Sequence, residues 1–229
     1  MSRTAVAIVA VIVVAVLATV GAIALTSVRS TPAAVPASGT VPSNGTRVAF
    51  YGDSYTLGTG ASDRAKRWST VICAERGWSE FNHSTNGLGF INNRAALRID
   101  EPGQVIADTP DIVFVTMGLN DNFSYDTAAK QIHTQIDTDL GRLRAALPDA
   151  RLIVVEPFWY TDERPTSLGV IIRWVRAAAS AVDADYIPGA SRWIEHHPGW
   201  MASDGLHPND AGYAEMAKRM DVELSKLGL

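Results

Sequence analysis

Cysteine is almost absent from this sequence of 229 residues, which contains only Cys73. A single cysteine forms no disulfide within the chain, so the disulfide-scaffold classes are excluded, and the length is ample for a hydrophobic core. Cys73 follows Val71 and Ile72 and has no basic cluster or second cysteine beside it. This context predicts a buried small hydrophobic residue rather than a reactive thiol.

Positive charge is also scarce, and it is unevenly distributed. Arg3 and Arg29 are the only charged residues among the first 45, so the remainder carries 18 basic and 24 acidic residues. An acidic domain without a long Lys/Arg run is a poor partner for a phosphate backbone. We therefore expect no nucleic-acid binding.

Charge is missing entirely from Ala5–Leu25, a run of 21 residues that only Thr19 and Gly21 interrupt. As a helix this run would be about 32 Å long, enough to cross the hydrocarbon core of a bilayer. It exceeds the apolar region of a typical signal peptide and so favours an uncleaved anchor, although Ala22–Ala24 could serve as a cleavage site. Residues 1–26 are expected to form a hydrophobic helix that is a signal anchor or signal peptide.

Residues 27–45 are rich in Pro, Ser, Thr and Ala and show no amphipathic period, which predicts a semi-extended tether. Arg3 and the α-amino group precede the apolar run, and Arg29 alone follows it closely. The positive-inside rule then places the N-terminus in the cytoplasm. We expect the domain at 46–229 to be extracytoplasmic, either membrane-anchored or secreted.

From Thr46 onward, apolar runs alternate with helical patterns. The expected strands are Arg47–Tyr51, Glu80–His83, Asp111–Met117, Arg151–Val155 and Tyr186–Ile187. Runs of this kind are typical of strands buried on both faces of a parallel sheet. Apolar residues at spacings of three and four predict helices over 129–147, 168–182 and 213–227, the last after a cap at Asn209 or Asp210. Together these patterns predict a doubly wound α/β domain with about five strands.

Ligands of such sheets bind beyond the carboxyl ends of the strands, so the loops there are the informative ones. Three strand-end loops and the segment before the last helix carry polar groups: Gly52–Tyr55, Asn86–Gly89, Gly118–Asp121 and Asp204–Pro208. They supply a hydroxyl, a glycine-rich backbone, an amide and a carboxylate–imidazole pair. These are the groups that acyl transfer requires.

The chemistry of these side chains suggests a role for each. Ser54 becomes a nucleophile only when a base takes its proton, and His207 is the natural base near neutral pH. Asp204 lies three residues earlier and can hold one imidazole nitrogen, which leaves the other for Ser54. The oxyanion donors would be the Ser54 N–H, a glycine N–H of the loop at 87–89 and the amide of Asn120.

Each of these motifs alone is also typical of an ordinary turn or helix cap. Their combination at the predicted strand ends, and in this order, favours a catalytic site. On these motifs the chain resembles the SGNH hydrolases, the GDSL esterase/lipase superfamily. The family is named for four residues in four blocks, which correspond here to Ser54, Gly87, Asn120 and His207.

The match to the family involves one choice, at Gly87, and one departure, at Tyr55. Gly87 is assigned rather than Gly89 because it lies five residues after Asn82, the spacing that the family shows. Tyr55 stands where the family's name has leucine, at a position that flanks the nucleophile and leaves the catalytic assignment intact.

The resemblance extends from residue 46 to the C-terminus. It implies a three-layer α/β/α flavodoxin-like sandwich, no metal or cofactor, and hydrolysis through a serine acyl-enzyme. The Gly-x-Ser-x-Gly motif of the α/β-hydrolases is absent, so that scaffold is not expected.

The sequence gives weaker support for a metal site and for aromatic substrate contacts. His196 and His197 are adjacent in a predicted loop without a third ligand at metal spacing, so we expect no metal site. Among the aromatic residues near the expected site, Phe123 and Trp200 are predicted to contact substrate.

We therefore expect a serine esterase or acylhydrolase that cleaves lipid or carbohydrate esters outside the cytoplasmic membrane. The alternatives are an O-acyltransferase that uses the same Ser54, His207 and Asp204, and a binding module on the same fold. The binding module is disfavoured because every catalytic residue type is present.

Overall fold

The computed structural model describes residues 45–229. The predicted hydrophobic helix and the tether up to residue 44 lie outside the described residues. Within 45–229, no helix combines the length and the apolar character needed to cross a membrane.

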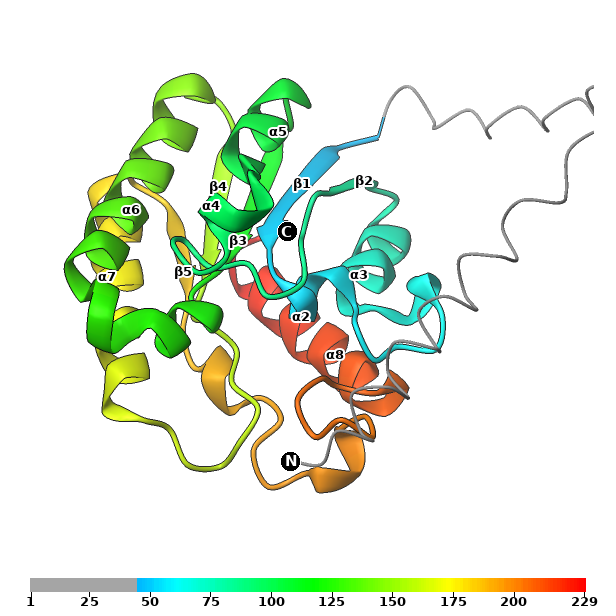
Figure 1. Cartoon of the computed structure of the whole chain (residues 1–229). Coiled ribbons are helices and arrows are strands. Elements are labelled where there is room, and N and C mark those ends of the chain that lie inside the picture. Colours follow the sequence, from blue (N-terminus) through cyan, green and yellow to red (C-terminus); the bar gives the residue numbers. More distant parts are fainter. Residues whose placement is uncertain (1–44) are drawn as a thin grey trace, which may run out of the picture. The chain divides into compact units, whose positions relative to one another are not determined.

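A five-stranded parallel sheet forms the centre of the domain (Figure 1). Its strands are β1 (Arg47–Gly52), β2 (Ser79–Asn82), β3 (Ile112–Thr116), β4 (Arg151–Val155) and β5 (Asp185–Ile187). The strand order is β2-β1-β3-β4-β5, that of flavodoxin-like sheets. All five predicted strands are confirmed, and no end differs from the prediction by more than one residue.

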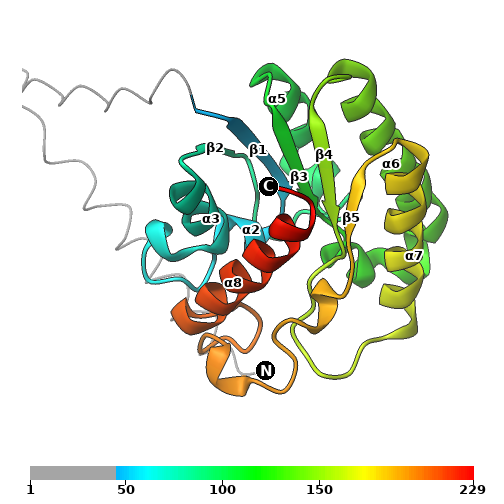
Figure 2. The ribbon, with the colours of Figure 1, turned by 180° about the vertical axis from the view of Figure 1, so that it is seen from behind.

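Helices cover both faces of the sheet, which gives the three layers (Figures 1 and 2). One face packs against α3 (Trp68–Arg76) and α8 (Asp210–Lys226). The other packs against α5 (Glu101–Ala107), α6 (Tyr125–Ala146) and α7 (Thr166–Ala181). Two helices of four residues, α2 (Ser54–Leu57) and α4 (Arg94–Leu97), lie in the loops. The cap of α8 is Asn209, whose side chain accepts from the N–H groups of Ala211 and Gly212.

Alternate side chains of each strand enter opposite layers. On β1, Val48 and Phe50 belong to the core beneath α3 and α8, whereas Ala49 and Tyr51 belong to the core beneath α5, α6 and α7. Both sets are buried, which explains why the strands read as nearly continuous apolar runs.

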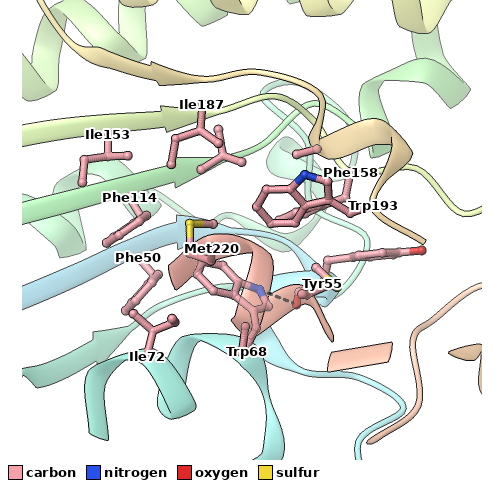
Figure 3. Packing of buried hydrophobic residues seen from close by; sticks show 14 of the residues in the cluster. Phe50, Tyr55, Trp68, Ile72, Phe114, Ile153, Phe158, Ile187, Trp193 and Met220 are labelled. Carbon is pink, nitrogen blue, oxygen red and sulfur yellow. Dashed lines mark hydrogen bonds between the residues drawn. The ribbon is translucent and has the colours of Figure 1, made fainter. Parts of the chain in front are cut away.

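The core beneath α3 and α8 is aromatic and reaches the loop after β1 (Figure 3). The Phe50 and Phe114 rings stack with centroids 5.1 Å apart, and the Trp68 ring meets Phe50 edge-on at 5.5 Å. The Trp68 indole N–H donates to the carbonyl oxygen of Tyr55 at 3.1 Å. Core packing therefore fixes the residue directly after Ser54.

Cys73 lies in α3 and is buried, as its apolar context predicts. Burial raises the pKa of the thiol well above its usual range. The group is thus a protonated, packed side chain rather than a thiolate nucleophile.

The topology determines where a ligand can bind. The chain runs from β1 outward to β2 and then returns to β3 on the other side of β1. In open α/β sheets this reversal opens a crevice at the carboxyl ends of the two strands. Ser54 directly follows β1, and Asn120 follows β3, so both predicted site residues lie at the reversal.

Candidate active site

Ser54 is the first residue of α2, immediately beyond the end of β1. Asp53 is extended and caps the helix, since its carboxylate accepts from the Tyr55 N–H at 2.9 Å. The first N–H groups of a helix have no partner within it, and the Ser54 N–H has no acceptor among the described residues. This position offers a side-chain hydroxyl and a free backbone donor at the same point.

Gly52 shows how closely the strand end is packed. A Cβ at this position would lie 2.5 Å from Thr116 Oγ1 and 2.7 Å from Thr56 Cβ, so no side chain fits without displacing one of them. The Thr56 and Thr116 hydroxyl oxygens are 2.6 Å apart and hydrogen-bonded. Glycine is required here because β1, β3 and α2 meet at this point, and their contact holds Ser54 in place.

Tyr55 connects the nucleophile turn to the loop that carries His207. Its hydroxyl donates to the Leu206 carbonyl at 2.7 Å, and its ring stacks on Phe158 with centroids 5.7 Å apart. The rings of Tyr55 and His207 are 6.2 Å apart. The residue that departs from the family's leucine thus joins two segments that are 151 positions apart in the sequence.

Asp204 and His207 form the pair that their spacing predicts. One Asp204 oxygen accepts from the N–H groups of Leu206 and His207, each at 2.9 Å, and the other lies 2.7 Å from His207 Nδ1. The His207 backbone N–H, the His207 ring and the Leu206 N–H together lower the pKa of Asp204 to about 2. Gly205, between the two, adopts φ +64° and closes the turn. The carboxylate holds Nδ1 and leaves Nε2 available for a nucleophile.

No hydrogen bond joins the Ser54 hydroxyl to the His207 ring within residues 45–229. The Tyr55–Leu206 bond nevertheless brings the two segments together. Hydrogen bonds between a base and its nucleophile commonly tighten only in the substrate complex. The structure therefore assembles the two halves of the predicted triad without closing the bond between them.

The two glycines of the second block, Gly87 and Gly89, have different surroundings. Its N–H has no acceptor in the described part of the chain, and its carbonyl accepts from the side-chain amides of Asn92 and Asn93, both at 2.9 Å. Gly89, by contrast, donates its N–H to the Asn92 carbonyl at 3.0 Å, and a Cβ there would lie 2.6 Å from the Asp121 carboxylate. Gly87 has a donor to offer an oxyanion, whereas Gly89 is required by packing.

Asn120 is buried, and both protons of its amide are already engaged. The nitrogen donates to the Leu88 carbonyl at 3.0 Å and to the Asp53 carboxylate at 3.3 Å. The longer of these bonds is the weaker. An oxyanion would therefore replace Asp53, while the bond to Leu88 keeps the amide oriented.

Asp121 is a site residue that the sequence did not single out. Its carboxylate accepts from three consecutive backbone N–H groups, those of Phe90, Ile91 and Asn92, at 2.7, 2.8 and 3.2 Å. Burial raises the pKa of Asp121, and the three N–H groups oppose that rise. The side chain fixes the loop that presents the Gly87 N–H. The available sequence signal was a carboxylate adjacent to Asn120.

Two more buried acids lie behind the nucleophile. Burial raises the pKa of Asp53 to about 7 and that of Glu101, the first residue of α5, to about 9. The Thr85 side chain and the Gly52 backbone oppose the shift at Glu101, but neither makes a hydrogen bond of normal geometry to its carboxyl oxygens. Burial therefore favours the neutral, protonated form of Glu101.

The two predicted substrate contacts have different surroundings. Phe123 is 58% exposed, with one side of its ring near Trp159 at a centroid distance of 6.5 Å. The ring of Trp200 stacks on His197 at 3.6 Å, and the guanidinium of Arg219 lies 5.9 Å from the indole. Phe123 is thus available to a ligand, whereas Trp200 is engaged by its neighbours. Both contacts stay predictions.

The adjacent histidines have separate partners. His196 Nδ1 lies 2.8 Å from the Asp162 carboxylate, whereas the His197 ring stacks on Trp200. No group of three metal-ligating side chains occurs within residues 45–229.

Comparison with known proteins agrees with this geometry. Residues 50–215 match the model of the GDSL-like lipase/acylhydrolase family. The GDSL lipase Rv0518 of Mycobacterium tuberculosis is 29% identical over 184 residues, which cover 76% of this chain and 79% of that protein.

Solved structures share the fold at lower identity. TesA superposes with a TM-score of 0.64 at 20% identity, covering 80% of this chain and 99% of that one. The psychrotrophic esterase EstA from Pseudoalteromonas sp. gives 0.63 at 17% identity and covers 80% and 98%. A variant of Axe2, an acetyl xylan esterase from Geobacillus stearothermophilus, gives 0.56 at 19% identity and covers 76% and 92%.

Proposed function

The chain belongs to the GDSL-like lipase/acylhydrolase family, and from this premise we propose that it cleaves esters through a covalent acyl-enzyme on Ser54. Membership of the family makes it a carboxylic ester hydrolase. In the proposed mechanism the Ser54 oxygen attacks the ester carbonyl while His207 Nε2 takes its proton. The Asp204 carboxylate on Nδ1 stabilises the imidazolium that forms.

The negative charge of the tetrahedral intermediate needs donors on the opposite side. The free N–H groups of Ser54 and Gly87 supply two, and the Asn120 amide supplies the third when it leaves Asp53. His207 then protonates the departing alcohol, and the ester bond breaks to leave an acyl group on Ser54. A water molecule, activated by the same imidazole, releases the acid and restores the hydroxyl.

One observation carries this proposal: the Asp204–His207 pair leaves Nε2 free and is tied, through Leu206 and Tyr55, to the turn that presents Ser54. The remaining donors surround the same strand ends. A binding module would need neither the oriented imidazole nor the free N–H groups.

The proposed substrates are lipid or carbohydrate esters outside the cytoplasmic membrane. The support for this location is the uncharged run Ala5–Leu25 followed by the tether, which would hold the domain at the outer surface. Fractionation of cells that express the full chain, with protease added from outside, tests it. Protection of the domain in intact cells would refute the location.

The activity is tested with the purified full chain in detergent on p-nitrophenyl acetate, butyrate and octanoate, beside Ser54→Ala. We expect turnover that disappears in the variant, with the melting temperature nearly unchanged. Activity that persists in Ser54→Ala would refute the nucleophile assignment. Transfer of the acyl group to an added alcohol in preference to water would identify the acyltransferase alternative.

A further inference from the structure

A cavity of about 460 Å³ borders the loop that carries the proposed base. Three segments form it: 160–162 after β4, 194–198 after β5, and 201–205, which runs directly into the Asp204–His207 turn. None of the proposed catalytic groups lines it.

Specific contacts fix the walls of the cavity. The Asp162 carboxylate accepts from the His196 backbone N–H at 2.6 Å and binds its ring Nδ1 at 2.8 Å, which joins the first two segments. The Asn209 amide donates to the Gly199 and Met201 carbonyls, both at 2.9 Å, and so holds the third segment. The cavity is therefore a defined feature of the fold and not a gap between loose loops.

The position of the cavity relates it to one side of the reaction. The Ala202 N–H donates to the His207 carbonyl at 2.8 Å, so the wall and the base share one loop. The oxyanion donors Gly87 and Asn120 instead follow β2 and β3. Because His207 delivers its proton to the leaving oxygen, the alcohol of the ester lies on the His207 side. The cavity thus borders the alcohol part of the substrate.

The lining combines rings with free polar groups. The Tyr160 hydroxyl, the Ser203 hydroxyl and the His197 ring nitrogens have no hydrogen-bond partner among the described residues. The lining also includes apolar side chains, among them Ile194 and Met201. A fatty chain would strip water from these polar groups and give nothing in return. A sugar offers C–H faces to the rings and hydroxyls to the polar groups.

We propose that this cavity binds a carbohydrate alcohol, so that the enzyme acts on acylated sugars. The proposal rests on the proposed function, since it places the sugar on the leaving-group side of Ser54. It assigns Tyr160 as a stacking residue and Ser203 as a hydrogen-bonding residue, both for specificity.

The test compares two acetate esters that differ only in their alcohol: a methyl glucoside with one acetyl group, and ethyl acetate. Acetate release by the full chain is followed by titration for the wild type, Tyr160→Ala and Ser203→Ala. We expect kcat/KM for the acetylated sugar to fall about tenfold in Tyr160→Ala and about threefold in Ser203→Ala. The values for ethyl acetate stay unchanged.

Val222→Ala is the control, because it truncates an exposed apolar side chain on α8 that does not line the cavity. A melting curve for each variant confirms that it folds. As a readout independent of the chemical step, methyl glucoside is expected to inhibit ethyl acetate hydrolysis competitively in the wild type and not in Tyr160→Ala.

The outcomes separate the two proposals. If the wild type hydrolyses neither ester in a Ser54-dependent way, the proposed function is overturned. Hydrolysis of ethyl acetate with equal changes for both esters in Tyr160→Ala would overturn the sugar site alone. A preference for octanoyl esters that disappears in Tyr160→Ala would also overturn it, because the cavity would then hold the acyl chain.

Discussion

Two aspartate–histidine pairs lie in neighbouring loops of this molecule with almost the same hydrogen bonds. Asp204 binds the His207 backbone N–H at 2.9 Å and its Nδ1 at 2.7 Å, and Asp162 binds the same two groups of His196 at 2.6 and 2.8 Å. Their surroundings differ, since the side chain of His207 is 14% exposed and that of His196 is 74% exposed.

A carboxylate–imidazole pair is therefore not by itself a catalytic site. His207 is tied through Leu206 and Tyr55 to the turn of Ser54, whose N–H has no acceptor within residues 45–229. His196 faces solvent, with Glu195 at 3.7 Å from its Nε2. The position of His207 over the sheet reversal, and not the pair geometry, is what supports its proposed role as the base.

Replacing each histidine tests this directly and should give the largest effect. His207→Ala is expected to lower kcat by about 10⁴-fold or more, because no other group takes the Ser54 proton. His196→Ala should leave kcat within about twofold. Both are measured on p-nitrophenyl acetate, and a comparable loss in His196→Ala would contradict the distinction between the pairs.

The proposed oxyanion donors are a second difference between the two pairs, because they lie at the strand ends to which the His207 loop is joined. Asn120→Ala removes the side-chain donor and should lower kcat by about 10²–10³ with a smaller change in KM. Asp121→Asn is a useful companion, because it weakens the hold on the loop of Gly87 without touching the amide. A near-wild-type rate in Asn120→Ala would mean that this amide only supports the fold.

The hydrogen bond between the Ser54 turn and the His207 loop can be removed by deleting one oxygen atom. Tyr55→Phe removes the hydroxyl that donates to the Leu206 carbonyl. We expect kcat to fall about tenfold and the free energy of unfolding to fall by about 1–2 kcal/mol, because the carbonyl loses its partner. Tyr51→Phe, which removes a buried hydroxyl bonded to the Asp139 carboxylate at 2.7 Å on the other face of the sheet, controls for the loss of a buried hydroxyl away from the site. Equal rates in both variants would show that the tie is not needed.

Two acids of the site, Asp204 and Glu101, should make the stability respond to pH with opposite signs. Hydrogen bonds lower the pKa of Asp204, so its contribution to stability is present above the unfolded pKa and disappears as the pH falls toward 2. Burial raises the pKa of Glu101 to about 9, above its unfolded value near 4.5. Glu101 therefore destabilises the fold progressively as the pH rises between these values.

Glu101→Gln isolates that second effect, because it keeps the shape and removes the titration. The free energy of unfolding of the wild type should fall relative to the variant, by at most about 1.4 kcal/mol per pH unit between pH 5 and 9. Urea unfolding at pH 5, 7 and 9 measures it. A difference between the two proteins that does not change with pH would show that Glu101 keeps its ordinary pKa.

Much of the fold was predictable because both faces of the sheet are buried. The β-branched runs identify β3 and β4 directly, and the long apolar stripe of α6 is unmistakable. The four shorter helices, α2, α3, α4 and α5, were not predicted. They have four to nine residues, too few turns for a helical period to emerge from the sequence.

The site likewise has contacts that the sequence predicts and contacts that it does not. The Asp204–His207 pair is local, and its spacing predicted it. The contacts of Asn120 with Asp53 and of Asp121 with Phe90 join residues 67 and 31 positions apart, so they follow from the return of β3 beside β1 and not from any motif. The cavity beside the base loop is likewise built from three separate segments.

The amide of Asn120 has a consequence for the cycle as a whole. Its nitrogen donates to the Asp53 carboxylate in this structure, and in the proposed mechanism this donor moves to the oxyanion. In the proposed cycle the amide therefore exchanges one protein acceptor, the Asp53 carboxylate, for the oxyanion. Before substrate binds, the Asp53 carboxylate thus accepts the Asn120 hydrogen bond that the oxyanion accepts in the proposed transition state.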